Sequence, residues 1–136
     1  MMVLSHVAIG GVIGTIFENP YIAFFLGIII HLLMDKVPHF WPKKKKNEIY
    51  FKVIDIGSSL LLMLTYWLVG FHGINFWAGV MGSLSVDIVT VGIGPIKKAK
   101  LGQWQEKRQP HINKPIYLLT DASFIAIGIY LIWGLQ

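Results

Sequence analysis

The stretch PYIAFFLGIIIHLLMDKVPHFWPKKKK (Pro20–Lys46) combines an apolar run, a proline stop and a cluster of lysines. The run from Tyr21 to Lys36 is long enough for about four helical turns. Pro38 ends this helix, because proline disfavours helical geometry in the preceding residue and lacks the amide that would continue the ladder. An apolar helix followed at once by lysines is typical of a membrane segment that ends at a cytoplasmic loop.

The composition of the whole chain favours the same class of protein. Hydrophobic residues make up 54% of the 136 residues and charged residues only 14%, which is too apolar for an ordinary soluble domain of this size. The net charge of +5 lies in short loops between apolar runs, so we interpret it as a topology signal and expect no nucleic-acid partner. The absence of cysteine excludes disulfides, thiolate metal ligands and cysteine nucleophiles.

The apolar runs predict an all-α fold, a polytopic membrane helix bundle that forms a single integral membrane domain over residues 1–136. About five transmembrane helices are expected: Met2–Phe17, Tyr21–Lys36, Asn47–Val69, Phe76–Gly94 and Pro115–Trp133. Small residues spaced four apart predict close packing between some of these helices. The pairs are Gly10 with Gly14, Ala78 with Gly82, and Ala122 with Ala126.

The lysines and arginines predict the orientation of the bundle. All 12 fall between Lys36 and Lys52 or between Lys97 and Lys114, whereas the turns at Glu18 and His72 contain none. By the positive-inside rule, the amino terminus and both basic segments are cytoplasmic and the carboxyl terminus lies outside.

Acidic residues and histidines in the predicted helices gather at one depth. At about 1.5 Å per residue they all lie roughly 6 to 12 Å below the cytoplasmic face. They are His6, His31, Asp35, Asp55, Asp87 and Asp121. A charged side chain at mid-bilayer costs about 2.5–3.5 kcal/mol on insertion scales, so we expect these side chains to converge inside the bundle.

The densest motif in this layer is HLLMDKVPH (His31–His39). His31 and Asp35 are four residues apart, so they project from one helical face and could bind the same metal ion. His39 follows the proline stop and could turn back toward the site. Imidazole and carboxylate ligands suit zinc, manganese, iron or nickel. The alternative is that the pair only forms hydrogen bonds between helices.

Three further residues near the predicted site or its loops can each be explained without a role in metal binding or catalysis. His111, in the second basic segment, could be a ligand or a general acid, or a solvated loop residue. Lys52 lies one turn before Asp55 and could pair with it, which would compete with metal binding by that carboxylate. His72 is interpreted as an ordinary turn residue.

Three stretches resemble a known family. SHVAIGGVIG (Ser5–Gly14), ENPYIAFFLGIIIHLLMDKVPHFWP (Glu18–Pro42) and WAGVMGSLSVDI (Trp77–Ile88) are similar to small bacterial membrane-bound metal-dependent hydrolases, the YdjM-like, LexA-regulated inner-membrane proteins. Ser85-Val86-Asp87 stands where that family usually has a Pro-Asp pair, and the loop has only His111 where relatives tend to have several histidines.

The resemblance implies a metal-dependent hydrolase in the bacterial cytoplasmic (inner) membrane, with zinc or manganese as the expected metal. One or two divalent ions would acidify a water molecule and polarise an ester or phosphoryl oxygen. A site near the membrane face suits a membrane lipid as partner, with a lipid-like ester or phosphate as substrate and the lysines attracting its head group. The expected metal ligands are His6, His31, Asp35, His39, Asp55 and Asp87, and the expected catalytic residues are Asp55, Asp87 and His111.

Two other functions fit parts of the pattern. A small ion or proton transporter would also bury acids and histidines, but the outer halves of the predicted helices are almost purely apolar, which argues against a continuous path. A non-catalytic membrane adaptor would use the polar layer only to hold its helices together.

Overall fold

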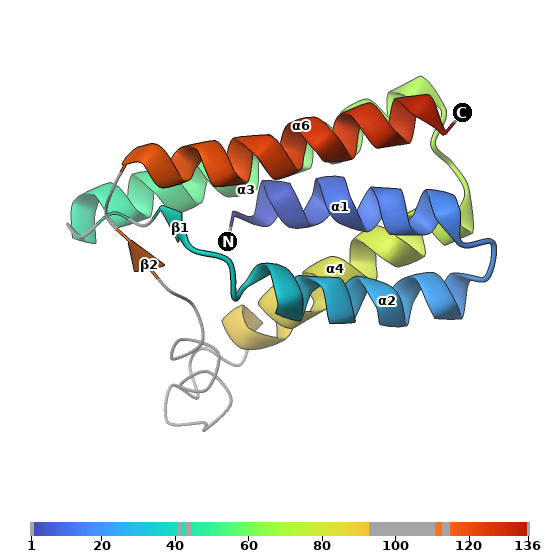
Figure 1. Ribbon diagram of the computed structural model, residues 1–136, viewed down its shortest axis with the longest axis horizontal. Coiled ribbons are helices and arrows are strands. Elements are labelled where there is room, and N and C mark those ends of the chain that lie inside the picture. Colours follow the sequence, from blue (N-terminus) through green and yellow to red (C-terminus); the bar gives the residue numbers. More distant parts are fainter. Residues whose placement is uncertain (1, 41, 43–44, 93–110, 113–114, 136) are drawn as a thin grey trace.

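The computed structural model describes residues 2–40, 42, 45–92, 111–112 and 115–135. Five α-helices lie in this part of the chain (Figure 1). They are α1 (Val3–Ile16), α2 (Pro20–Met34), α3 (Lys45–Val69), α4 (Ile74–Gly92) and α6 (Leu118–Gly134), with a 3-10 turn, η2 (Pro115–Tyr117), before α6. The all-α prediction is confirmed, and the helix bounds agree to within a few residues. The predicted end of the fourth helix, Gly94, lies outside the described residues.

One described helix is long and apolar enough to cross a membrane. This segment is Asn47–Val69 in α3, with 23 residues. The other four helices are apolar but shorter. The predicted number of about five spanning helices therefore stays a prediction.

Helix α1 is the centre of the bundle. It packs against α2, α3, α4 and α6, and Figure 1 shows it running between α6 and α2. A tight turn reverses the chain into α2, where the Asn19 side-chain oxygen accepts hydrogen bonds from the amides of Tyr21 (2.9 Å) and Ile22 (3.3 Å). Pro20 occupies the first helical turn, where its missing amide costs nothing. The two helices therefore lie antiparallel beside each other.

Helix α4 approaches α1 and α2 closely through glycine. A Cβ atom added at Gly79 would collide with the carbonyl oxygen of Gly10 and with the backbone of Gly14, both on α1. A Cβ atom at Gly82 would collide with the carbonyl oxygen of Phe24 on α2. Backbones this close require small residues, so the close packing predicted at Gly10, Gly14 and Gly82 is confirmed.

The contact between α6 and α1 differs from the prediction. Ala122 and Ala126 are both exposed on α6. Gly128 instead lies against Ala8 of α1, where an added Cβ would come within 2.8 Å of the alanine side chain. The close approach of α6 to α1 shown by the structure therefore lies at Gly128, a residue outside the predicted pair.

The interior of the bundle is apolar toward one end and polar toward the other. The apolar cluster consists of Val7, Val12, Tyr66, Phe71, Phe76, Val80, Leu84 and Ile132. The buried polar residues are Ser5, His6, His31, Asp35, Asp55, Ser59, Ser83 and Asp121. Because most of these polar residues lie where α1 begins and α2 ends, the predicted polar layer exists as a buried cluster at one end of the bundle.

Candidate metal centre

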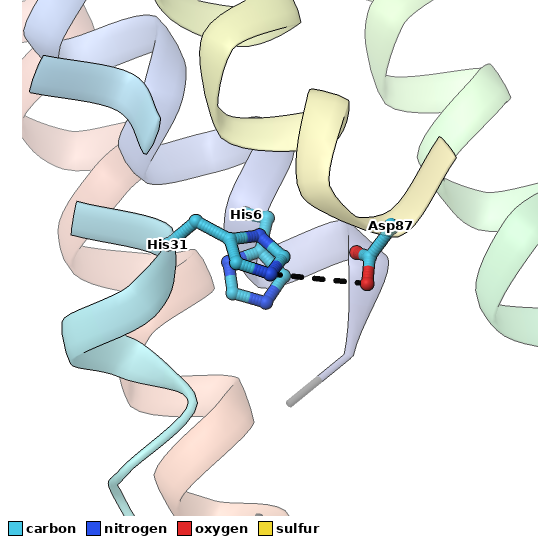
Figure 2. Close-up of side chains that lie close together, drawn as sticks. All are labelled: His6, His31 and Asp87. Atoms are coloured by element: carbon cyan, nitrogen blue, oxygen red, sulfur yellow. Dashed lines mark ion pairs between the residues drawn. The ribbon is translucent and has the colours of Figure 1, made fainter. Parts of the chain in front are cut away.

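Three helices bring two histidines and an aspartate together. His6 lies near the start of α1, His31 near the end of α2 and Asp87 near the end of α4, and their side chains meet in Figure 2. One ligand atom from each lies within 4.8 Å of the others. Both histidines are fully buried, at 0% exposure. This arrangement confirms that these three residues converge.

Small residues one helical turn away from His6, His31 and Asp87 explain why the three helices can come close together at this cluster. Each metal-ligand candidate is four residues from a small residue on the same helix face. The pairs are His6 with Gly10, Gly27 with His31, and Ser83 with Asp87. A Cβ atom added at Gly10 would come within 2.9 Å of the Ser83 side chain, and one at Gly27 within 2.8 Å of the Ser83 amide nitrogen. Because the backbones of α1, α2 and α4 touch one helical turn away from the three side chains, His6, His31 and Asp87 lie within reach of one another.

Asp35 completes the cluster. Its Oδ1 lies 3.4 Å from His6 Nε2, and its Oδ2 lies 3.2 Å from His31 Nε2. His31 Nε2 is also 3.9 Å from Asp87 Oδ1. The two imidazole rings are stacked, with centroids 4.0 Å apart. Two ring nitrogens therefore face two carboxylates in a space shielded from solvent.

The proton position on His31 follows from its other ring nitrogen. Nδ1 lies 2.6 Å from the carbonyl oxygen of Ser83. A carbonyl only accepts, so Nδ1 carries a hydrogen, and in a neutral imidazole Nε2 then presents its lone pair. A lone pair that faces carboxylates requires a cation between them, either a proton or a metal ion. Metal-binding histidines commonly donate their second ring N–H to a backbone carbonyl in this way.

His6 supplies a second reason to place a cation here. Neither of its ring nitrogens makes a hydrogen bond within the described part of the chain, although the ring is fully buried. The 3.4 Å contact between Nε2 and Asp35 does not have hydrogen-bond geometry. Leaving a buried polar group unsatisfied costs about 1–3 kcal/mol. Coordination of an ion would satisfy one of these nitrogens, so the donor set fits a divalent metal.

Access to the cluster differs among its members. The Asp87 side chain is 25% exposed, whereas the side chains of His6, His31 and Asp35 are 0–5% exposed. Asp87 is therefore the least buried of the four side chains, although its Oδ2 atom is itself buried.

Asp55 and Asp121 lie beside this cluster but contact the start of α1. Asp55 Oδ2 accepts a hydrogen bond from the Val3 amide (2.8 Å), and its Oδ1 accepts one from the Leu4 amide (3.1 Å). Asp121 Oδ1 accepts from the Met2 amide (3.1 Å) and the Ser5 hydroxyl (3.2 Å). The structure therefore does not bring Asp55 into the group formed by His6, His31 and Asp87.

Lys52 contacts a different acid from the one suggested by the sequence. Its Nζ lies 2.7 Å from Glu48 Oε1, one turn earlier on α3. His72 is exposed in the turn after α3 and packs edge-on against Trp67, as expected for a turn residue.

The two remaining histidine candidates are neighbours in the backbone. Strand β1 (His39–Phe40) pairs in parallel with β2 (His111–Ile112), and His39 is the register partner of His111. The side chains of both residues lie outside the described part of the structure, so their predicted roles stay predictions. Sequence reasoning did not find this pairing, because strands of two residues have no periodic pattern.

Comparison of the chain with family models, with curated proteins and with solved structures gives no match. The case for a metal centre therefore comes from the geometry of His6, His31, Asp35 and Asp87.

Proposed function

We propose that this chain is a multi-pass membrane protein that binds a divalent metal ion at His6, His31, Asp35 and Asp87. With this ion it hydrolyses an ester or phosphate bond in a lipid-like substrate at the cytoplasmic face. Membership of the membrane-bound metal-dependent hydrolase family is part of the same proposal. The observation that carries it is the orientation of His31, whose Nε2 faces two carboxylates while Nδ1 donates to the Ser83 carbonyl.

The outer surface of the bundle supports a location in the membrane. Large apolar side chains are exposed on several helices, among them Phe25 on α2, Leu61 on α3, Ile88 on α4 and Leu119 on α6. Transfer of apolar surface out of water contributes roughly 25 cal/mol per Å². A helix such as α2, with 15 residues, is ~22 Å long and thus shorter than a ~30 Å hydrocarbon core. Local thinning of the bilayer accommodates such short segments.

The donor set suits zinc or manganese, because imidazole nitrogens and carboxylate oxygens bind both. Such an ion would supply Lewis acidity to an ester or phosphoryl oxygen. The chain itself contributes the orientation of the site. Ser83 fixes the His31 ring, and Asp35 lies against the Nε2 atoms of both histidines.

Asp87 has the position needed for a proton acceptor. Its carboxylate belongs to the cluster, and its side chain is the least buried of the four, so it would take the proton from an attacking water while His6, His31 and Asp35 hold their places. Lys36 follows Asp35 directly and is exposed at the same end of the bundle. A lysine at this edge attracts an anionic head group, which favours a lipid phosphate over a neutral ester.

The test is hydrolysis by the full chain purified in detergent, with short-chain phosphatidic acid and a matched neutral ester as substrates. We expect phosphate release that chelation abolishes and that added zinc or manganese restores. Asp87→Asn should lower the rate about 100-fold or more, as expected for loss of a general base. Glu48→Gln, which removes an acid from the exposed face of α3, should leave the rate unchanged. Turnover that survives chelation would contradict the proposal.

A non-catalytic membrane adaptor is the second candidate. The observation in its favour is the complete burial of His6 and His31, since structural metal sites are closed to solvent. Bound metal without turnover of either substrate would favour the adaptor over the hydrolase.

A further inference from the structure

We infer that Asp55 and Asp121 are positioning residues that hold the first turn of α1 and thereby set the place of His6 in the metal centre. We call these two residues the α1 clamp. The inference rests on the proposed metal centre, and it assigns the two acids a role other than metal binding or catalysis.

The start of α1 needs hydrogen-bond acceptors that its own sequence does not supply. The first amides of any α-helix have no partner within the helix. Met2 occupies the N-cap position of α1, and its side chain forms no capping hydrogen bond. Acceptors must therefore come from elsewhere in the fold.

The α1 clamp supplies these acceptors from two other helices. Asp55 on α3 accepts from the amides of Val3 and Leu4, and Asp121 on α6 accepts from the Met2 amide and the Ser5 hydroxyl. Negative charge at a helix N-terminus also interacts favourably with the helix dipole. The clamp therefore joins α1, α3 and α6 at the end of the bundle that contains the candidate metal centre.

The two acids use their oxygens differently. Asp55 engages both oxygens with backbone amides. Asp121 uses Oδ1 for both of its hydrogen bonds, and its buried Oδ2 has no hydrogen-bond partner among the described residues. Asparagine keeps one acceptor oxygen and replaces the other with a donor. Replacement by asparagine is therefore compatible with the contacts of Asp121 but not with those of Asp55.

His6 is coupled to the clamp through the chain. It follows Ser5 directly and lies within two residues of Leu4, so it belongs to the same stretch of helix. A rotation of α1 by one residue turns the helix by about 100° and would carry His6 away from His31. Residues that orient a metal ligand commonly affect metal affinity by about 10–100-fold when replaced.

The experiment is a Co²⁺ titration of the full chain in detergent, followed by visible absorption, together with hydrogen exchange at the Val3 and Leu4 amides. Asp55→Ala and Asp55→Asn should both weaken Co²⁺ binding about 10–100-fold and speed exchange at the two amides. Asp121→Ala should also weaken binding, whereas Asp121→Asn should stay close to wild type. At saturating Co²⁺ every clamp variant should show the wild-type spectrum. Glu48→Gln, on the same helix as Asp55, is the matched control and should change nothing.

Several results of this experiment would overturn the inference. An altered saturated spectrum or a lower stoichiometry in Asp55→Asn would make Asp55 a ligand and overturn the inference. Equal weakening by Asp121→Asn and Asp121→Ala, or unchanged exchange at Val3 and Leu4 in both Asp55 variants, would also overturn it. Failure of the wild-type protein to bind Co²⁺ would contradict the proposed metal centre instead. In that case faster exchange in Asp55→Asn would still establish that Asp55 holds α1.

Discussion

His31 Nδ1 lies 2.6 Å from the carbonyl oxygen of Ser83, one helical turn before Asp87 on α4. This contact between α2 and α4 orients the imidazole so that Nε2 faces Asp35 and Asp87. The acceptor is a backbone carbonyl, which remains when the side chain at position 83 is replaced. The orientation of His31 therefore depends on the backbone position of α4 and not on the serine side chain.

Replacement of His31 by alanine should abolish stabilisation by metal. A ligand present at 100 times its Kd contributes about 2.7 kcal/mol to the free energy of unfolding. Zinc or manganese should therefore raise the unfolding temperature of the wild-type protein but not that of His31→Ala, measured in detergent. His72→Ala, at the opposite end of the bundle, should keep the full metal response. An equal response in His31→Ala would show that metal binds elsewhere.

Asp35→Asn should weaken metal binding while the protein stays folded. The Asp35 carboxylate contacts the Nε2 atoms of His6 and His31, and the amide replaces one of its oxygens with a donor that would point at a ring nitrogen. We expect a loss of about 10–100-fold in zinc affinity, measured by competition with a chromogenic chelator. Glu18→Gln, in the exposed turn after α1, serves as the control. Unchanged affinity in Asp35→Asn would remove Asp35 from the centre.

The glycine contacts predict a stability difference between two similar substitutions. Gly82→Ala places a methyl group against the Phe24 carbonyl and should destabilise the fold by about 1–3 kcal/mol. Gly57→Ala on α3 meets nothing within 4 Å and should instead stabilise the helix by up to about 1 kcal/mol. Denaturant unfolding in detergent compares the two. Equal effects would mean that α4 does not touch α2 as closely as the structure shows.

The orientation of the bundle can be tested with single cysteines, since the chain has none of its own. Glu18→Cys and His72→Cys should react with a membrane-impermeant thiol reagent in intact bacterial cells. Lys36→Cys and Lys98→Cys should react only after the cells are opened, because basic segments stay in the cytoplasm. Labelling of all four positions in intact cells would contradict the multi-pass arrangement.

The helices, and the gathering of acids and histidines at one end of the bundle, could be predicted from the sequence for simple reasons. Apolar runs end at Pro38 and at the turns near Glu18 and Gly70, and counting residues from those ends gives the depth of each acid and histidine. Depth does not give the rotation of a helix about its axis. For that reason the sequence predicts Asp55 as a ligand beside His31, whereas in the structure its carboxylate accepts hydrogen bonds from two amides of α1.

A sequence signal for the rotation did exist. Glycine or serine lies four residues from His6, His31 and Asp87, on the face where the three helices touch. A ligand candidate on the same face as a small residue therefore points toward the helix junction. Asp121 has no small residue four positions away on its helix. Asp55 has Ser59 four positions later, but the Ser59 hydroxyl donates to the Asp55 backbone carbonyl within the same helix. Capping of α1 by two other helices depends on tertiary contacts that no local pattern contains.

Elemental analysis tests the central claim most directly. The wild-type chain, His31→Ala and His72→Ala would be purified in detergent without chelator and measured together for divalent metals. The proposed centre predicts about one ion per chain in the wild-type protein and in His72→Ala, and little or none in His31→Ala. No bound metal in the wild-type protein, or the same metal content in His31→Ala, would contradict it.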